Sequence, residues 1–276
     1  MLNTQTMRKI EGFVYEKPRS VQEIALHLGK NWRTADRYID EIEKNLGTVA
    51  TRTFRGGTRG ALKIVYWASV EKVSHSVFQE RLEQEIIAGK RKEDFSAFDI
   101  FQYVPEGKRS LSIERREDET LDELRSMLLS AKKQVLFFSG NLSFTNFKDG
   151  KTDLLSVLEE LMEKKVTLKV LCRVDLVSKE NIERLLALNV IHGKDFVEIR
   201  HDLHPVRGFV IDGKRVRLKE LKEPTGKIHE LNKKILLFYT ITDVSWAEWL
   251  SRVFWKKFSN SPDAHRRLEQ MKNIKV

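Results

Sequence analysis

The side chains with the most evident chemical potential lie together at His204, Pro205, Val206 and Arg207, with Asp212 five positions beyond the arginine. A histidine can attack a phosphodiester, a guanidinium binds anions through a fixed fork of donors, and a carboxylate accepts hydrogen bonds from hydroxyl groups. Arg207 and Asp212 therefore indicate a site for an anionic or polyhydroxyl ligand. An ion pair with an ordinary turn is an equally weighted alternative, because Asp-Gly between two short strands is typical of a hairpin.

A second group of candidate ligand contacts follows the apolar strand predicted over residues 135–139, in the run Ser139, Gly140 and Asn141. In α/β sheets, ligand sites form where the carboxyl ends of the strands meet. We therefore expect Ser139 and Asn141 to line one cleft together with Arg207 and Asp212.

The remaining patterns argue against a metal or a cofactor. His201 and His204, with Asp202 between them, have a loose metal-ligand spacing, but they lie in a predicted loop without a second ligand pair on a helix. The single cysteine, Cys172, excludes a disulfide scaffold and a four-cysteine zinc site. The sequence has neither a Walker A nor a GxGxxG pattern, so no cofactor and no metal is predicted.

Positive charge is concentrated at the front of the chain. Residues 1–68 hold 12 Lys/Arg and 7 Asp/Glu, a net charge of +5, and the other 208 residues supply the rest of the total of +10. Residues 47–67 contain Arg52, Arg55, Arg59 and Lys63 and no acid. A short segment with charge of one sign is typical of a surface that contacts phosphate, and a solvated loop is the alternative.

The elements that would position these arginines can be predicted from caps and turns. A helix over residues 5–16 is followed by Ser20 and Glu23, which form a capping box for a second helix. Gly29 supplies the positive φ of a tight interhelical turn, and Asn31 caps a third helix. Strand-like runs over residues 49–54 and 61–67 flank a glycine-rich loop, which predicts a hairpin.

This order of elements, over about residues 4–68, resembles the winged helix-turn-helix domains of prokaryotic transcription regulators. The resemblance implies that the exposed start of the third helix reads base edges and that the hairpin contacts phosphate or the minor groove. The expected DNA contacts are Asn31, Trp32, Arg33, Thr34 and Arg37 on the helix, and Arg52, Arg55 and Arg59 on the hairpin.

Residues 69–92 have the pattern of one helix, with Val70, Val73 and Val77 at helical spacing. A short dimerising coiled coil and a linker helix packed on its own domain remain equal alternatives. Residues 93–116 combine an aromatic cluster with Pro105 and Gly107, and they predict the domain boundary.

From residue 117 onward, predicted helices and strands alternate, which favours an α/β layer with a parallel sheet in its first half. Around Arg207 the pattern resembles the His-x-Lys-x4-Asp motif of phospholipase D-like domains. When the motif is aligned on Asp212, the lysine falls on Arg207 and the nucleophilic histidine falls on Pro205, while residues 214–220 lack the Gly-Ser-x-Asn stretch. The resemblance therefore implies binding without cleavage, unless His204 shifts into the position of the nucleophile.

The 276 residues are 41% apolar and 33% charged, with a pI near 9.5. The longest uncharged apolar run is too short to span a bilayer, and the N-terminus lacks the pattern of a secretory signal, so a cytoplasmic protein without membrane contact is expected. The predicted fold is an α+β winged-helix domain followed by an α/β phospholipase D-like domain. The predicted divisions are residues 1–68, a helical connector over residues 69–116, and residues 117–276.

The order of these parts resembles that of the TrmB-type transcription regulators of archaea. The resemblance implies a DNA-binding regulator whose second domain binds an effector, often a sugar, and does not cut phosphodiesters. We expect a homodimer that pairs through the helix over residues 70–87, and Arg207 suits an anionic or polyhydroxyl effector. The expected partner is double-stranded DNA. Two alternatives remain open: a phospholipase D-like nuclease or phosphodiesterase targeted by its winged helix, and a DNA-bound scaffold whose second domain mediates assembly.

Overall fold

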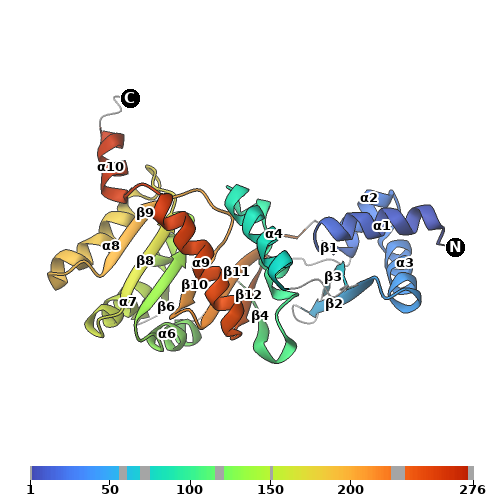
Figure 1. Ribbon diagram of the computed structural model, residues 1–276, viewed down its shortest axis with the longest axis horizontal. Helices are drawn as coiled ribbons and strands as arrows, with labels where there is room; N and C mark the ends of the chain where they lie inside the picture. The colour runs from blue at the N-terminus through green and yellow to red at the C-terminus, as the bar shows by residue number, and fades with distance from the viewer. Residues whose placement is uncertain are drawn as a thin grey trace. The chain divides into compact units, whose positions relative to one another are not determined.

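The computed structural model describes residues 2–55, 61–68, 75–115, 121–149, 152–224 and 234–272 (Figure 1). Contacts divide the chain into two compact units. The first unit comprises residues 1–78, 113–116 and 221–236, and the second comprises residues 79–112, 117–220 and 237–276.

The first unit combines helices with a small antiparallel sheet. Its elements, in chain order, are α1 (Thr4–Glu16), β1 (Arg19–Ser20), α2 (Val21–Leu28), α3 (Trp32–Asn45), β2 (Val49–Arg55) and β3 (Ala61–Trp67). The strands lie in the order β1-β3-β2, and each neighbouring pair is antiparallel. The predicted order of helices and hairpin strands is confirmed.

Local hydrogen bonds explain where these helices begin and end. Ser20 Oγ accepts from the Glu23 amide at 3.1 Å, and a Glu23 carboxylate oxygen accepts from the Ser20 amide at 2.7 Å. Gly29 has φ 62°, and its N–H donates to the Leu26 carbonyl at 3.0 Å, which ends α2. Asn31 Oδ1 accepts from the Thr34 amide at 2.8 Å and starts α3. All three predicted signals are therefore confirmed.

The second unit is built on a twisted sheet. Its strands, in chain order, are β4 (Arg109–Arg115), β5 (Gln134–Phe138), β8 (Thr167–Cys172), β9 (Val197–His201), β10 (Gly208–Ile211), β11 (Arg215–Lys222) and β12 (Ile235–Ile241). The contact division assigns one end of β4, β11 and β12, residues 113–115, 221–222 and 235–236, to the first unit. Over the described residues their spatial order is β4-β12-β11-β10-β5-β8-β9. The pairs β5–β8 and β8–β9 are parallel, as predicted, and β10 runs antiparallel to both β5 and β11.

Helices cover both faces of this sheet (Figure 1). They are α4 (His75–Ala88), α5 (Ala97–Phe101), α6 (Leu121–Leu129), α7 (Leu154–Glu163), α8 (Lys179–His192), α9 (Val244–Asn260) and α10 (Ala264–Lys272). Phe137 joins a core formed with apolar residues of α6, α7, α8 and α10. The next residue, Phe138, points to the opposite face, because side chains alternate along a strand, and its ring lies 5.1 Å from that of Phe254 in α9.

The predicted connector, residues 69–116, is shared between the two units. Val70 and Val73 lie outside the described residues, and the side chain of Val77 is not described. The aromatic cluster predicted to mark a boundary is instead core, since the Phe101 ring lies 5.1 Å from that of Tyr239 on β12. Its neighbours form α5 and β4, which the sequence did not indicate. Throughout the described ranges, no helix is both long and apolar enough to cross a membrane.

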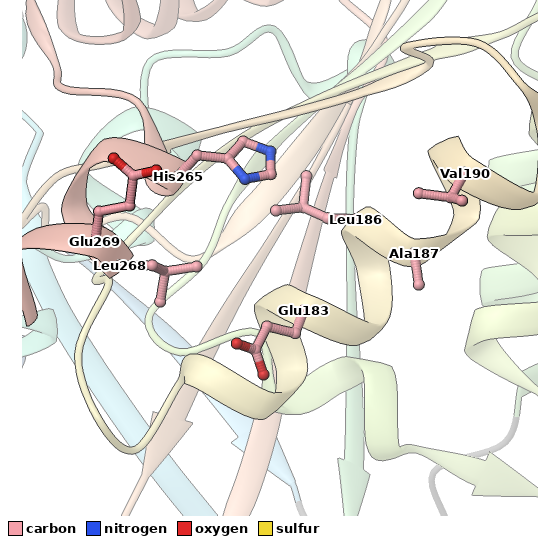
Figure 2. A pocket seen from close by; sticks show the side chains of 7 residues that line it. All are labelled: Glu183, Leu186, Ala187, Val190, His265, Leu268 and Glu269. Carbon is pink, nitrogen blue, oxygen red and sulfur yellow. The ribbon is translucent and has the colours of Figure 1, made fainter. Parts of the chain in front are cut away.

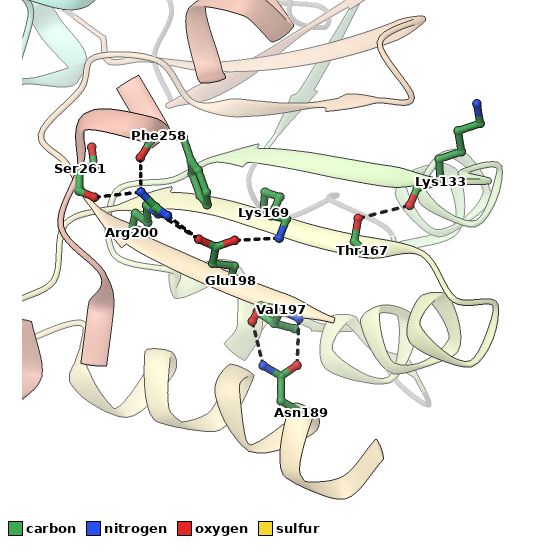
Figure 3. A network of polar contacts seen from close by, with 9 residues as sticks. All are labelled: Lys133, Thr167, Lys169, Asn189, Val197, Glu198, Arg200, Phe258 and Ser261. Atoms are coloured by element: carbon green, nitrogen blue, oxygen red, sulfur yellow. Dashed lines mark hydrogen bonds and ion pairs between the residues drawn. The ribbon is translucent and has the colours of Figure 1, made fainter. Parts of the chain in front are cut away.

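Strand β9 is an edge strand of the sheet, and side chains and loop backbone occupy backbone groups along its outer edge (Figure 3). Asn189 Nδ2 donates to the Val197 carbonyl and Asn189 Oδ1 accepts from the Val197 amide, both at 2.8 Å. The His201 amide donates to the Pro262 carbonyl at 2.8 Å. On the sheet surface, Glu198 accepts hydrogen bonds from Lys169 at 2.7 Å and Arg200 at 2.9 Å.

Candidate functional site

The start of α3 presents an exposed cationic surface in the first unit. Ala35 and Ile39 are fully buried in its core, so the opposite side of the helix faces solvent. Asn31, Arg33 and Arg37 are exposed there. The predicted neighbours Trp32 and Thr34 lie on the same turn, with Trp32 37% exposed and Thr34 half-buried.

Two aromatic rings of α3 lie beside these arginines. The Arg33 guanidinium lies 5.7 Å from the centre of the Trp32 ring, and that of Arg37 lies 5.4 Å from the Tyr38 ring. Arginine is attracted to the face of an aromatic ring while its N–H groups stay directed outward. Both arginines therefore keep donors available to an anionic surface.

The same helix carries four acids, and Lys63 of β3 pairs with two of them. Lys63 Nζ lies 2.7 Å from Asp36 and 2.8 Å from Asp40. Burial lowers the pKa of Lys63, but the hydrogen bonds that it donates to both carboxylates, together with their charges, outweigh that effect and raise the pKa above its ordinary value. Sequence reasoning assigned Lys63 only to the basic hairpin. Acids four residues apart on the predicted helix were the available signal for this pairing.

The hairpin residues are described only in part. Arg52 lies on β2, opposite Ile64 of β3, and is exposed. Arg55 is the last residue of β2, and its side chain is not described. Arg59 lies outside the described residues, so the predicted grouping of the three stays a prediction.

In the second unit, the structure brings Arg207 against the loop that follows β5. The guanidinium lies directly over Gly140, where an added Cβ would come within 3.1–3.4 Å of its atoms. Arg207 NH1 donates to the carbonyls of His204 at 2.8 Å and Val206 at 2.7 Å. The next residue, Gly208, lets the backbone of β11 approach closely, because its φ is 147° and a Cβ there would lie 2.2 Å from the Arg217 carbonyl oxygen.

Ser139 and Asn141 lie in that same loop and shape its backbone. Ser139 Oγ is buried and accepts from the Leu142 amide at 3.1 Å. Asn141 Oδ1 accepts from the Ser143 amide at 3.2 Å, and the Asn141 carbonyl accepts from Asn181 Nδ2 at 3.0 Å. We call Ser139, Gly140, Asn141, Arg173 and Arg207 the strand-end cluster.

Asp212 does not join this cluster, which corrects the predicted cleft. Arg207 and Asp212 flank β10 at its two ends, about 16 Å apart at the rise of an extended strand. Both Asp212 carboxylate oxygens accept backbone hydrogen bonds, Oδ2 from Lys132 at 2.8 Å and Oδ1 from Lys133 and Gln134 at 2.9 Å each. Asp212 therefore caps the start of β5, at the opposite edge of the sheet from Arg207.

Arg173 was missed by the sequence analysis, although it directly follows β8. The rule that singled out residues 139–141, that ligand sites follow parallel strands, would also have found it. Burial lowers the pKa of Arg207, and the nearby charge of Arg173 lowers it further. Both cations have acidic neighbours, since Arg173 pairs with Asp175 and the charge of Glu93 raises the pKa of Arg207. Their guanidinium groups still suit an anionic ligand, because each binds anions through a fixed fork of donors.

His204 lies in the core rather than in the open cluster. It is 2% exposed, its Nε2 lies 3.1 Å from the Leu171 carbonyl oxygen, and Phe138 packs edge-on against its ring. Burial lowers its pKa to about 3, with a further contribution from Arg207. Pro205 beside it is buried as well, and a Cβ at Gly89 would come within 2.8 Å of the proline ring. The imidazole ring of His204 is therefore neutral and held in place by its neighbours.

The two histidines with metal-ligand spacing have separate partners. His201 Nδ1 accepts from the Val174 amide at 2.8 Å, whereas His204 turns to Leu171. No group of three or more potential metal ligands occurs among the residues that the structure describes.

A hollow of about 320 Å³ lies on the outer surface between α8 and α10 (Figure 2). Leu186 and Leu268 contribute apolar surface, and Glu183 and Glu269 lie on the two walls. Val190 at one end is 84% exposed. The hollow shares no lining residue with the strand-end cluster.

No family model and no curated protein matches the chain. Among solved structures, the chain resembles the phospholipase D family member Nuc from Salmonella typhimurium (14% identity, TM-score 0.41, covering 56% of this chain and 98% of that one). It also resembles TrmBL2, described as an archaeal chromatin protein with a novel mode of DNA binding (16% identity, TM-score 0.39, 95% and 94% covered). A third is NucT from Helicobacter pylori (14% identity, TM-score 0.40, 56% and 98% covered). At these identities and TM-scores, the likenesses do not identify what this chain binds.

Proposed function

We propose that the protein is a DNA-binding transcription regulator and that its first unit is a winged helix-turn-helix domain. The observation that carries the proposal is the charge of α3. Arg33 and Arg37 are exposed on its first turns, while the acids Asp36 and Asp40 on the same helix are held by Lys63. The outer surface of α3 is thus positive at the end that enters the major groove in this class of domain.

In this proposal, α3 reads base edges and the hairpin contacts the backbone. Arg33 and Arg37 are four residues apart and so share one face of the helix. Either can pair with the O6 and N7 acceptors of guanine, a contact that discriminates against other bases by about 1–3 kcal/mol. The exposed Arg52 on β2 extends the positive surface toward phosphate or the minor groove.

The direct test replaces Arg33 or Arg37 with Ala and measures binding to a site selected from random DNA and to unselected DNA. Loss concentrated on the selected site, by about tenfold or more, is expected from a lost base contact. Arg266→Ala removes one exposed cation from the second unit and serves as the charge-matched control. Equal loss on both DNAs would reduce α3 to a phosphate contact, and unchanged binding would contradict the proposal.

We propose that the second unit senses a ligand or mediates dimerisation without catalysis. The arginines of the strand-end cluster suit an anionic or polyhydroxyl effector, which must favour one arrangement of a homodimer to change DNA binding. A thermal shift with inorganic phosphate, sugar phosphates and free sugars tests it, with Arg207→Leu expected to abolish the shift. If none of these ligands shifts the wild type, the assembly alternative is favoured.

The competing nuclease hypothesis has its own test. Hydrolysis of a nitrophenyl phosphodiester is measured for the wild type and for His204→Ala. The buried ring of His204 and its contact with the Leu171 carbonyl support an expectation of no turnover. Turnover that disappears in the variant would establish His204 as a nucleophile and overturn the sensor proposal.

A further inference from the structure

Three carboxyl groups from different elements converge within the second unit. They are Glu85 of α4, Asp99 of α5 and Glu220 of β11. Ser96 joins two of them, because its amide donates to Asp99 Oδ2 at 3.3 Å and its hydroxyl donates to Glu220 at 3.0 Å. Asp99 is only 5% exposed. The chain thus brings Glu85 and Glu220 beside the buried carboxyl group of Asp99.

Tyr239 and Arg81 are two neighbours of this carboxyl cluster. Tyr239 of β12 donates its hydroxyl to Glu220 Oε2 at 3.1 Å, and its ring packs against Phe98 and Phe101. Arg81 of α4 is the cation that acts on Asp99, and it also pairs with Glu85 at 3.4 Å and hydrogen-bonds Tyr103. Over the described residues, the charges of Glu85 and Glu220 oppose the ionisation of Asp99, and the charge of Arg81 favours it.

The electrostatic effect on Asp99 is large. Burial raises its pKa from 3.8 to about 7, assisted by repulsion from Glu85 and Glu220 and opposed by Ser96 and Arg81. Burial also raises the pKa of Glu85, against the effect of Arg81. Near neutral pH, the folded protein therefore holds a proton that an exposed aspartate would have released.

The carboxyl cluster acts on the position of α4. Leu82 and Ile86 are fully buried, and Glu83 pairs with Lys256 of α9 at 2.7 Å. Residues 75–78 of α4 belong to the first unit, whereas the helix belongs to the second unit from Gln79 onward. The helix is therefore one of several places where the chain passes from one unit to the other.

We propose that the Glu85–Asp99–Glu220 cluster is a proton-sensitive anchor, which holds α4 on the second unit when Asp99 is protonated and loosens it when Asp99 is ionised. Ionisation places a negative charge on the buried Asp99 beside the half-buried Glu85 and Glu220, and α4 moves because it carries Glu85. The anchor requires neither DNA binding nor an effector.

The sign of the effect follows from proton linkage. A carboxyl group whose pKa is higher in the folded state binds its proton more tightly there. Between about pH 3.8 and 7, the folded state therefore carries the extra proton, and its stabilising effect is lost as pH rises through that window. The equilibrium constant for local opening of α4 should rise by up to roughly tenfold per pH unit and level off above about pH 7.

Hydrogen exchange of the full chain tests this anchor. Exchange of amides in residues 79–101 is measured from pH 5 to 8 and corrected for the chemical exchange rate. We expect a corrected opening constant that rises with pH in the wild type and stays level in Asp99→Asn. Glu80→Gln, a matched change at an exposed site of the same helix, should retain the wild-type rise.

A second variant keeps the test decisive if Asp99→Asn does not fold. Glu85→Gln removes one repulsive neighbour, so its plateau should begin at a lower pH than in the wild type. A wild-type opening constant independent of pH, or a rise that persists in Asp99→Asn, would overturn the proposal. Because the measurement uses no DNA, failure of the regulator proposal would leave this result unchanged.

Discussion

Lys63 determines the charge that α3 presents to its surroundings. Its ammonium group lies within 2.8 Å of both Asp36 and Asp40, and its side chain is only 23% exposed. The two carboxylates would otherwise lie beside Arg33 and Arg37 on the same helix. Lys63 therefore reduces the negative charge beside Arg33 and Arg37, although it is not itself part of the exposed face of α3.

Replacement of Lys63 with Met should weaken DNA binding by more than the loss of one phosphate contact. Two uncompensated carboxylates near phosphate should cost about 1–2 kcal/mol, or roughly tenfold in affinity, at low salt. The triple variant Lys63→Met, Asp36→Asn, Asp40→Asn should recover most of that loss, measured by fluorescence anisotropy. If the triple variant binds as weakly as Lys63→Met, the lysine itself contacts DNA.

Some residue roles could be predicted because their partners are close in the chain. Asn31 and Ser20 cap helices through bonds to residues three positions away, and such short spacings are visible in the sequence. Lys63 pairs across 27 and 23 residues, and Asp212 caps strand β5 from about 80 residues away. Long-range partners depend on the fold, which is why the sequence misplaced Asp212.

Among the elements, the β2–β3 hairpin is the second part of the first unit that we propose contacts DNA. Its strands are fixed by pairing from Val49 with Trp67 to Arg55 with Ala61. This register places Arg52 and the end of β2 on a defined framework. The contribution of the hairpin arginines can be measured through the dependence of binding on salt.

Replacing Arg52, Arg55 and Arg59 together with Ala should flatten the slope of log affinity against log salt by up to about 3. Each phosphate contact contributes about −0.9 to that slope through counterion release. All DNA sequences should be weakened alike. The control replaces three exposed cations of the second unit: Lys133, Lys194 and Arg266. An unchanged slope in the hairpin variant would show that the hairpin does not touch DNA.

Helices and strands with strong local signals were predictable from the sequence, and weakly marked ones were not. Short apolar segments of the sequence predicted β5, β8 and β12, with ends within two residues of those observed. β4 escaped prediction because its run Arg109–Arg115 is polar and charged, and only the neighbouring sheet makes it a strand. The antiparallel placement of β10 beside β5 likewise depends on tertiary pairing.

For the molecule as a whole, two buried groups oppose each other in their effect on stability against pH. His204 has a pKa of about 3 when folded and an ordinary value of 6.5, so the stability associated with it is complete above pH 6.5 and is lost as pH falls. Asp99 acts in the reverse direction between 3.8 and about 7. Their slopes cancel between roughly pH 4 and 6.5.

Global unfolding of the wild type should therefore hide the anchor that local exchange reveals. In Asp99→Asn, the opposing slope disappears, and stability should fall by up to about 1.4 kcal/mol per pH unit on acidification from pH 6.5. Urea unfolding followed through the tryptophans of α9 measures it. A variant as insensitive to pH as the wild type would mean that His204 does not resist protonation.

The side-chain amide of Asn189 affects whether copies of the protein can aggregate through β9. A carboxamide presents an N–H donor and an oxygen acceptor side by side, as a peptide group does, so both backbone groups of Val197 find partners without another strand. Uncapped sheet margins recruit neighbouring chains and seed fibrous aggregates. The Asn189 side chain thereby prevents another strand from pairing with β9 at Val197.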